Sequence, residues 1–421
     1  MTTITAPTFP RLFAGIDVGP SYRAHLNRFG DRPTFNDRKA EGLRTLHQLL
    51  DDAPLIGRGG GGIAASLKLA FLSTSTKPVI VVNAMEGEPA SSKGVALAMV
   101  APHLVLDGAL MLAEALKSSQ IIIAIADDDT RTTQGFQRAI GERRESISME
   151  ISHPPAHYVT GEESALVHWL DEGSALPTFR PIKPSFVKIG RRAALVHNLE
   201  TLAHLALLAR FGAGWYRSRG TSSSPGTTLI TVSGAVQSPS TYEWTFGRTL
   251  GELIEQAGGL VEGFGGALIG GYGGTWVGGN ALSLPIDHAS LRSAGATLGP
   301  GIVVVLPKAS CPVAEVTRVV EWMANESVGQ CGPCVYGLPA LAKDLRTLGW
   351  SRSTRNQFDR LLHHLTEVDG RGACRHPDGV VRLIRSCLSV FSAHFDEHLR
   401  SGPCAAVNAP TVMVLPKNRR R

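Results

Sequence analysis

The stretch PVIVVNAMEGEPASSKG, residues 78–94, decides how this sequence is predicted to fold. Its β-branched run predicts a short buried strand, which ends at Asn83 and continues into an acidic turn. The residues that follow predict a helix at about 103–116, the strand IIIAIA at 121–126 and a helix at 132–144. Because strands alternate with helices, we expect a layered α/β domain with a mostly parallel sheet and ligand groups at the strand ends.

A glycine run precedes this strand. IGRGGGGIAASLKLAFL, residues 56–72, passes from glycines into Ala, Leu and Lys residues of helical composition. Glycine lets backbone N–H groups approach an anion, and a helix start adds its dipole. Neither the dinucleotide fingerprint nor the P-loop pattern can be laid on the run, so it indicates either an anion-binding loop or a flexible one.

A second polar segment, HYVTGEESALVHWLDEG, occupies residues 157–173. We expect Thr160 to cap a helix whose first turn holds Glu162 and Glu163. Taken alone, two carboxylates at a helix start do no more than complement the helix dipole.

Composition limits the classes of protein that this chain represents. Its 421 residues, 43% hydrophobic and 19% charged, predict two to four folded domains. The chain begins without a basic and then apolar leader, and its apolar runs are shorter than a membrane span, so we expect a cytoplasmic protein without direct membrane insertion. The net charge of +6 comes partly from the terminal KNRRR, which is either a solvated end or a dock for an acidic partner. No pattern indicates binding of nucleic acid.

The second half of the chain changes character twice. Residues 227–260 predict strand, turn, strand and then a helix at about 249–256, and we expect tight turns in the glycine-dense segment 258–279. Apolar residues then recur at helical spacing in four segments, at 313–327, 337–350, 357–368 and 379–401, which predicts a four-helix array.

Five motifs, in chain order GRGGGGIAASLK, NAMEGEP, YVTGEESAL, PTFRP and VHNLETLA, resemble a known family. It is the NADH-binding, FMN-containing flavoprotein subunit of respiratory complex I, with its relatives in NAD-linked hydrogenases and formate dehydrogenases. The resemblance covers nearly the whole chain after residue 40. It implies a lead-in at 1–45, a Rossmann-like FMN domain at 46–221, a β-grasp module at 226–308, a helical iron-sulfur domain at 312–405 and a basic tail at 406–421.

The resemblance also implies which residues bind the flavin. One loop is expected to wrap the FMN phosphate and ribityl chain, and polar residues from later motifs are expected to complete the pocket. The loop residues are Gly57, Arg58, Gly59, Gly60 and Lys68, and the others are Asn83, Glu86, Tyr158, Gly161, Glu162, Asn198 and Thr201. A glycine nest with a lysine suits a phosphate, and amides and carboxylates suit ribityl hydroxyls.

For NADH, the resemblance places Glu88 and Glu163 near the dinucleotide. The sequence departs from the family here, because the phenylalanine of the family's G-F-P-T is Ile63, the aspartate of N-A-D-E is Met85, and the lysine-rich approach is altered at Lys183–Phe186. Where NADH binds, hydride passes to the flavin, which releases electrons singly to the cluster.

The motif GQCGPC, residues 329–334, has three interpretations: a redox dithiol, half of a zinc site, or part of an iron-sulfur site. A redox C-x-x-C is expected after a buried strand, whereas this one follows a predicted helix, and a zinc site calls for a second close pair. In the family the loop E-S-C-G-x-C-x-P-C and a remote cysteine hold a [4Fe-4S] cluster. The resemblance therefore implies ligation by Cys331, Cys334 and Cys374.

One family ligand is replaced by Val328. Three outcomes follow: a 3Fe-4S cluster, a 4Fe-4S cluster whose fourth ligand is water, His376 or Cys404, or no cluster. Cys387 lies in an apolar helical stretch and is interpreted as a core residue, and Cys311 has no motif around it.

The sequence leaves three functions to consider. The first is an electron-transferring flavoprotein that works between NADH or another donor, FMN, an iron-sulfur cluster and a partner such as a ferredoxin or other redox subunits, with peripheral association to a membrane complex. The second is a cofactor-poor assembly subunit, and the third is a thiol-disulfide or zinc protein. The retention of the flavin motifs favours the first.

Overall fold

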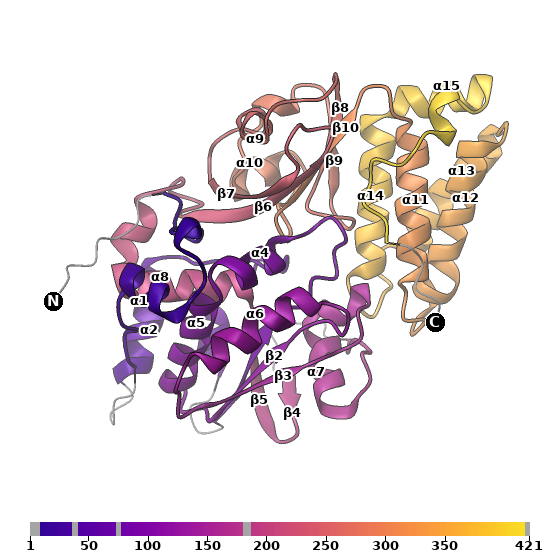
Figure 1. Ribbon diagram of the computed structural model, residues 1–421. Helices are drawn as coiled ribbons and strands as arrows, with labels where there is room; N and C mark the ends of the chain where they lie inside the picture. The colour runs from indigo at the N-terminus through magenta and orange to yellow at the C-terminus, as the bar shows by residue number, and fades with distance from the viewer. Residues whose placement is uncertain (1–8, 36–40, 73–76, 180–186, 417–421) are drawn as a thin grey trace. The chain divides into compact units, whose positions relative to one another are not determined.

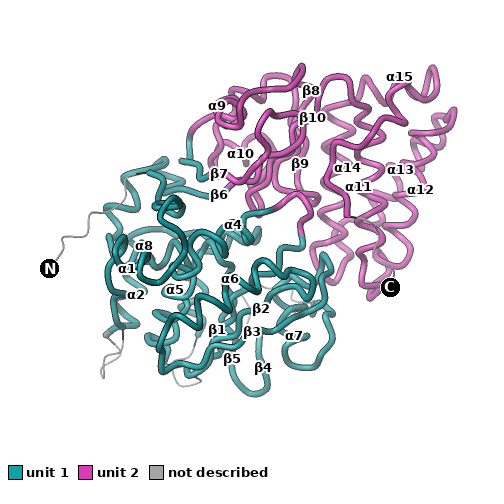
Figure 2. The backbone as a smooth tube through the Cα atoms, viewed as in Figure 1, with its two compact units in different colours: residues 1–87, 92–229, 243–247 teal, residues 88–91, 230–242, 248–421 magenta. Residues whose placement is uncertain are grey.

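The structure is a computed structural model that describes residues 9–35, 41–72, 77–179 and 187–416. The chain forms two compact units (Figure 2). The first unit comprises residues 1–87, 92–229 and 243–247, and the second comprises 88–91, 230–242 and 248–421. The three-part division into flavin, β-grasp and helical domains stays a prediction.

The first unit is built on the predicted sheet (Figure 1). Its strands are β1 Val79–Asn83, β2 Gln120–Ala124, β3 Ser148–Ser152, β4 Val187–Ile189 and β5 Arg192–Asn198, in the order β3-β2-β1-β5-β4. β1 pairs in parallel with both β2 and β5, β2 pairs in parallel with β3, and β4 is an antiparallel edge strand. The expectation of a mostly parallel sheet is confirmed.

Both faces of this sheet are buried, because alternate residues of β1 enter different cores. Ile80 and Val82 lie in the larger core, whereas Val79 and Val81 pack in a smaller one with Leu166 and Val167. Burial on both faces explains why β1 is an unbroken apolar run. The helical segments of the first unit are η1 Ile16–Val18, α1 Tyr22–Phe29, α2 Glu41–Asp52, α3 Ala65–Ala70, α4 Lys93–Val100, α5 Pro102–Ala115, α6 Thr130–Gly141, η3 Tyr158–Gly161, α7 Glu163–Glu172 and α8 Leu199–Arg217.

Two helices in the larger core approach each other closely at a glycine. A Cβ atom added to Gly108 of α5 would lie 2.1 Å from the carbonyl oxygen of Leu202 in α8. We therefore expect Gly108→Ala to lower the free energy of unfolding by about 1–3 kcal/mol, because backbone on both sides must move. The matched control is Gly141→Ala at the exposed last residue of α6, where an added Cβ meets nothing within 4 Å. Urea unfolding measures both, and equal effects would contradict this packing.

The second unit contains a five-stranded sheet and a bundle of helices (Figure 1). The sheet has the order β7-β6-β10-β8-β9, in which β10 pairs in parallel with β6 and antiparallel with β8. Positive φ angles at Gly258, Gly259, Gly270 and Gly271 agree with the expected tight turns. The strands are β6 Thr227–Gly234, β7 Ser240–Thr245, β8 Phe264–Ile269, β9 Thr275–Val277 and β10 Ile302–Pro307, and α9 Leu250–Gln256, η4 Ala281–Ser283 and α10 His288–Ser293 lie between them in the chain.

The expected four-helix array contains one additional helix. The helical spacing predicts a single helix at 379–401, but the helix breaks at Phe391, whose φ of −113° and ψ of 28° are not helical. The Phe391 ring packs edge-to-face on Trp276 of β9, with ring centroids 5.5 Å apart, so tertiary packing overrides the helical spacing at this point. The helices are α11 Pro312–Asn325, α12 Leu338–Trp350, α13 Arg355–Val368, α14 His376–Val390 and α15 Ser392–Ser401, with a π-helical turn at Pro333–Gly337 and a 3-10 turn at Ala405–Asn408.

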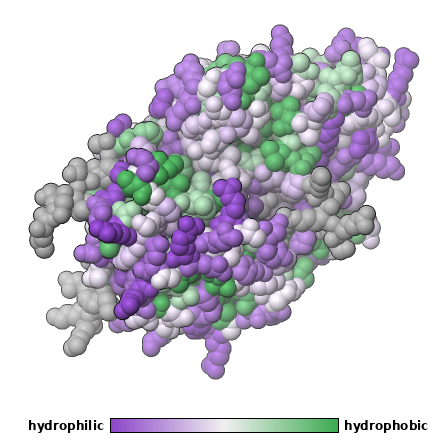
Figure 3. All heavy atoms as spheres, viewed as in Figure 1, coloured by the Kyte–Doolittle hydropathy of each residue, from purple (hydrophilic) through white to green (hydrophobic). Residues whose placement is uncertain are grey.

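Among the described residues, no single helix is long and apolar enough to cross a membrane. α4 and α5 reach the required length and composition only as a pair, and they are bent by 93° at the break between them. On the face drawn in Figure 3, hydrophilic residues predominate and apolar residues form small, separate groups.

Candidate flavin and iron-sulfur sites

Two asparagines lie side by side at the carboxyl edge of the first unit's sheet. Asn83 ends β1 and Asn198 ends β5, and the parallel register places them opposite each other. The chain runs from β1 outward to β2 and β3 and later returns to the other side of β1, so these residues mark the point where the strand order reverses. In open α/β sheets, ligands bind in the crevice outside this point.

The glycine loop lies against the same edge. It is closed at its base by a hydrogen bond from Gly57 N to Ile63 O of 2.9 Å. A Cβ added to Gly59 would be 3.5 Å from Asn198 Cβ, which places the loop beside the strand end. Residues 59–62 are exposed, and Gly60 and Gly62 have φ angles of 95° and 62° that favour glycine.

Arg58 anchors this loop and does not face the exposed side. Its backbone N–H donates to Thr201 Oγ1 at 2.9 Å, and its guanidinium is buried, where it donates to the Tyr216 hydroxyl and the Thr227 carbonyl. Only the backbone of Arg58 therefore lies on the loop that the resemblance assigns to the flavin. The Arg58 side chain is a structural group.

A buried ion pair that sequence reasoning missed holds the other side of Arg58. Lys93 Nζ donates to the Arg58 carbonyl at 2.6 Å and to Glu200 Oε2 at 2.9 Å, and both side chains are buried. The other oxygen of Glu200 accepts from Thr228 Oγ1 and Leu229 N. Burial alone would raise the pKa of Glu200, but the charges of Lys93 and Arg58 and the nearby His204 imidazole outweigh it, so the pKa lies well below its ordinary value.

Two backbone segments meet at the edge marked by Asn83. Its Nδ2 donates to the Gly161 carbonyl at 3.0 Å, and its Oδ1 accepts from Met85 N at 3.0 Å. A Cβ on Gly87 would approach the Tyr158 carbonyl to 2.7 Å, so glycine is needed where these two loops touch. The loop after β1 and the turn before α7 are therefore fixed against each other.

The carboxylates of the predicted pocket already have structural partners. Glu86 accepts from the backbone N–H groups of Gly94 and Val95 and so caps the start of α4. Glu162, not Thr160, is the N-cap of α7, accepting from Ser164 N and Ala165 N. The prediction of Thr160 as the cap is wrong because the residues before Glu162 form a 3-10 turn, which delays the start of the helix.

The two residues expected near NADH lie in different units. Glu163 pairs with Lys68, at 2.7 Å from Oε1 to Nζ, and Lys68 also donates to the Val196 carbonyl. Glu88 belongs to the second unit, where it accepts from Tyr272 N at 3.0 Å. The altered segment Lys183–Phe186 and the end of the PTFRP motif lie outside the described residues.

The residues at this edge fit FMN. A Cβ added to Gly61 or Gly62 would meet nothing within 4 Å, so there is open space beside the backbone of this exposed loop. The Lys68 ammonium, the two asparagine amides and the carboxylates supply the donors and acceptors that a phosphate and sugar hydroxyls require.

The three predicted cluster ligands gather at one end of the helical bundle. Cys331 and Cys334 lie within hydrogen-bonding reach of each other just before α12, Cys334 within the π-helical turn, and Ser327, which follows α11, hydrogen-bonds Cys334. His376, the first residue of α14, contacts the Met323 carbonyl at 2.9 Å, which brings the neighbouring Cys374 to the same end of α11. Burial raises the pKa of Cys334, so the thiol becomes a thiolate only beside a metal or another cation.

The structure reduces the number of residues that could be the fourth ligand of the iron-sulfur cluster. The alternative that named Cys404 is wrong, because Cys404 lies with Cys311 at the amino end of α11, and the 14 residues of this helix span about 21 Å. Ser327 and His376 are near the three cysteines, and burial lowers the pKa of His376 to about 4, which keeps its imidazole neutral.

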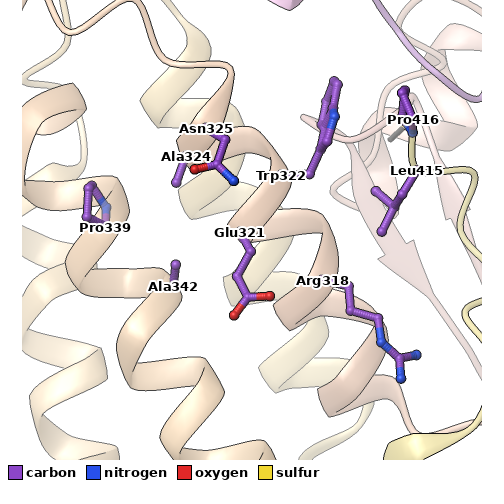
Figure 4. A pocket seen from close by; sticks show the side chains of 9 residues that line it. All are labelled: Arg318, Glu321, Trp322, Ala324, Asn325, Pro339, Ala342, Leu415 and Pro416. Carbon is purple, nitrogen blue, oxygen red and sulfur yellow. The ribbon is translucent and has the colours of Figure 1, made fainter. Parts of the chain in front are cut away.

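The second unit has a pocket lined by residues of α11, α12 and the segment after α15 (Figure 4). Its charged groups are engaged with neighbours, since Arg318 donates to the carbonyls of Val407 and Ala409, and Glu321 pairs with Arg346. It is lined by Arg318, Glu321, Trp322, Ala324, Asn325, Pro339, Ala342, Leu415 and Pro416. No predicted site residue lines it.

Comparison with known proteins points to the same two cofactors. The family described as "Nuo51 FMN-binding domain" matches residues 50–207, an SLBB domain matches 229–271, and the "NADH-ubiquinone oxidoreductase-F iron-sulfur binding region" matches 314–398.

Among curated relatives, the NADH-quinone oxidoreductase F subunit of Streptomyces coelicolor is 28% identical over 87% of this chain and 88% of its own length. The corresponding F 2 subunit of Rhizobium meliloti is 29% identical over 87% of this chain and 92% of its own. A solved structure of an NAD+-reducing [NiFe]-hydrogenase is similar with a TM-score of 0.80 and 26% identity, over 95% of this chain and 69% of that one.

Proposed function

We propose that this chain, which belongs to the family of flavoprotein subunits that includes the F subunit of NADH-quinone oxidoreductase, receives electrons on FMN and passes them to an iron-sulfur cluster within a larger redox complex. The observation that carries this proposal is the pairing of Asn83 with Asn198 where the strand order reverses, with the glycine loop held beside them. An exposed glycine loop beside polar groups at a strand end suits a bound cofactor, and the fold alone does not require this combination.

The roles of the residues follow from their contacts. Backbone N–H groups of Gly59 and Gly60 and the Lys68 ammonium are proposed to hold the FMN phosphate, and Gly57 is proposed to keep the loop closed through its hydrogen bond to Ile63. Arg58, Thr201, Glu86 and Glu162 are proposed to act through the backbone that they fix. Asn83, Tyr158, Gly161 and Asn198 are proposed to contact the ribityl chain and the flavin ring. The bound flavin would supply hydride acceptance and one-electron release, and the protein would supply its position.

The cluster is proposed to be held by Cys331, Cys334 and Cys374, with Ser327, His376 or water at the fourth iron. Three thiolates from a loop and a remote segment suit the corners of an iron-sulfur cluster. Neighbouring redox subunits receive the electrons. We propose that the immediate acceptor is an acidic ferredoxin or a ferredoxin-like protein that docks on this basic chain at the cytoplasmic side of a complex.

NADH is the proposed donor, and Glu163, which pairs with Lys68 in the first unit, is proposed to contact it. The substitution of Ile63 and Met85 for the family's phenylalanine and aspartate favours a second candidate, in which another redox protein delivers the electrons. In both cases the chain acts as an oxidoreductase component.

Titration of the anaerobic protein with NADH separates these donors. We expect NADH to bleach the flavin absorbance at about 450 nm. Restoring the family residues with Ile63→Phe and Met85→Asp should lower the KM for NADH by about 2- to 10-fold, because a stacked aromatic ring contributes about 0.5–1.5 kcal/mol.

A protein that contains flavin and iron which dithionite reduces but NADH does not would exclude NADH as the donor. The donor would then be another protein. Restored variants that also fail to respond to NADH would strengthen that exclusion.

A further inference from the structure

Four metal-binding side chains that the flavin and iron-sulfur sites do not use come together in the second unit. They are Cys311, His394, His398 and Cys404, whose ligand atoms all lie within 4.8 Å of one another. Cys311 is the N-cap of α11, and Cys404 is the N-cap of the 3-10 turn that follows α15. His394 and His398 are four residues apart on α15, so they share one face, with ring centroids 5.1 Å apart.

The spacing of the ligand atoms matches a tetrahedral ion. With Zn–S and Zn–N bonds of about 2.3 and 2.0–2.1 Å and tetrahedral angles, a sulfur and a nitrogen on the same zinc ion lie about 3.6 Å apart. Cys311 Sγ and His398 Nε2 are 3.7 Å apart. Two thiols and two imidazoles form the closed donor set of structural zinc, with no position left open for a substrate.

The hydrogen bonds of His398 prepare its Nε2 for a metal. His398 Nδ1 contacts the Leu348 carbonyl at 3.1 Å, and because a carbonyl only accepts, the proton is on Nδ1. The Cys404 backbone N–H donates to His398 Nε2 at 3.3 Å, so the lone pair is on that atom, and a metal would take it in place of this hydrogen bond. A backbone partner on the second ring nitrogen is the usual way in which a zinc-bound histidine is oriented.

His394 supplies an independent observation. Its Nε2 atom is buried and has no hydrogen-bond partner among the described residues. A buried polar atom without a partner costs free energy, and a bound cation removes that cost.

We propose that Cys311, His394, His398 and Cys404 bind one structural Zn²⁺ ion. The ion joins the amino end of α11 to α15 and to the segment after it. That segment already runs along α11, where Glu315 accepts from the backbone of Val412 and Met413. The site lies one length of α11, about 21 Å, from the iron-sulfur cysteines and does not depend on the proposed electron transfer.

Metal analysis of the full-length protein, purified anaerobically with a reductant, tests this proposal. We expect about one zinc per chain in addition to iron, and loss of that zinc in Cys404→Ser and His394→Ala with iron retained. In the matched control, Cys331→Ser, iron falls and zinc stays. Cobalt added to the zinc-free protein should give the visible absorption of a tetrahedral thiolate site, a readout that depends on ligand identity and not on folding alone.

Several results would overturn the zinc site. One is wild-type protein that contains no zinc although it was produced in zinc-supplemented cells. The others are Cys404→Ser protein that keeps its zinc, and a disulfide between Cys311 and Cys404 in the reduced preparation. If Cys404→Ser is insoluble, His394→Ala and cobalt binding by the wild type decide the question.

Discussion

Replacing Glu200 with glutamine will lower the free energy of unfolding of the first unit by about 3–5 kcal/mol. The carboxylate is fully buried and pairs with Lys93, whose ammonium would stay in the interior without an opposite charge. Glutamine keeps the size and one acceptor oxygen, so the loss is mainly electrostatic. The Arg58 carbonyl that Lys93 holds begins the glycine loop, and FMN affinity should fall as well.

Urea unfolding followed by circular dichroism measures this effect. The matched control is Asp359→Asn, which removes an exposed ion pair with Arg355 on α13 and is expected to cost less than about 1 kcal/mol. Equal losses in the two variants would contradict the assignment of Lys93 and Glu200 as a buried, mutually dependent pair.

The second large effect is expected from Cys334→Ala, which should abolish the iron-sulfur cluster and leave FMN bound. A cluster held by three thiolates has no spare cysteine to replace Cys334, because Cys311, Cys387 and Cys404 lie at the amino end of α11. Iron, acid-labile sulfide and the reduced-state paramagnetic resonance spectrum are the measurements. Full iron content in the variant would contradict the assignment.

The companion variant for the cluster is Val328→Cys, which restores the family's missing ligand. If the native cluster has three irons, we expect this variant to carry a fourth and to change its spin signature. An unchanged cluster would mean that residue 328 does not face the irons. Loss of FMN together with iron in Cys334→Ala would show general unfolding instead of loss of a ligand.

The position of the flavin site could be predicted because its signals are local. The β-branched run before Asn83 predicts a buried strand, and the glycine run has the composition of an anion-binding loop. The sequence does not reveal that Asn83 and Asn198 lie opposite each other. Their position depends on the register of two strands that are far apart in the sequence.

Other features depend on tertiary contacts that no local pattern records. Lys93 and Glu200 are 107 positions apart in the sequence, and the sequence around each one alone predicts an ordinary charged residue at the surface. The break at Phe391 follows from its packing on Trp276, although the helical spacing continues through it. The resemblance implies that Arg58 faces the phosphate, but the interior offers its guanidinium Tyr216 and Thr227.

The Cys/His cluster did leave a signal in the sequence. HFDEH, residues 394–398, places two histidines on one turn-spaced face of a helix, and Cys404 follows six residues later. The fourth ligand, Cys311, is 83 residues before His394, and only the return of α15 to the amino end of α11 reveals it.

Quantification of FMN, iron and sulfide in the anaerobically purified protein tests the central claim most directly. We predict about one FMN and three to four irons with matching sulfide per chain, and a flavin absorbance that reductant removes. Protein that is folded but contains neither flavin nor iron, even after reconstitution with both, would contradict the electron-transfer account and would favour a cofactor-poor assembly subunit.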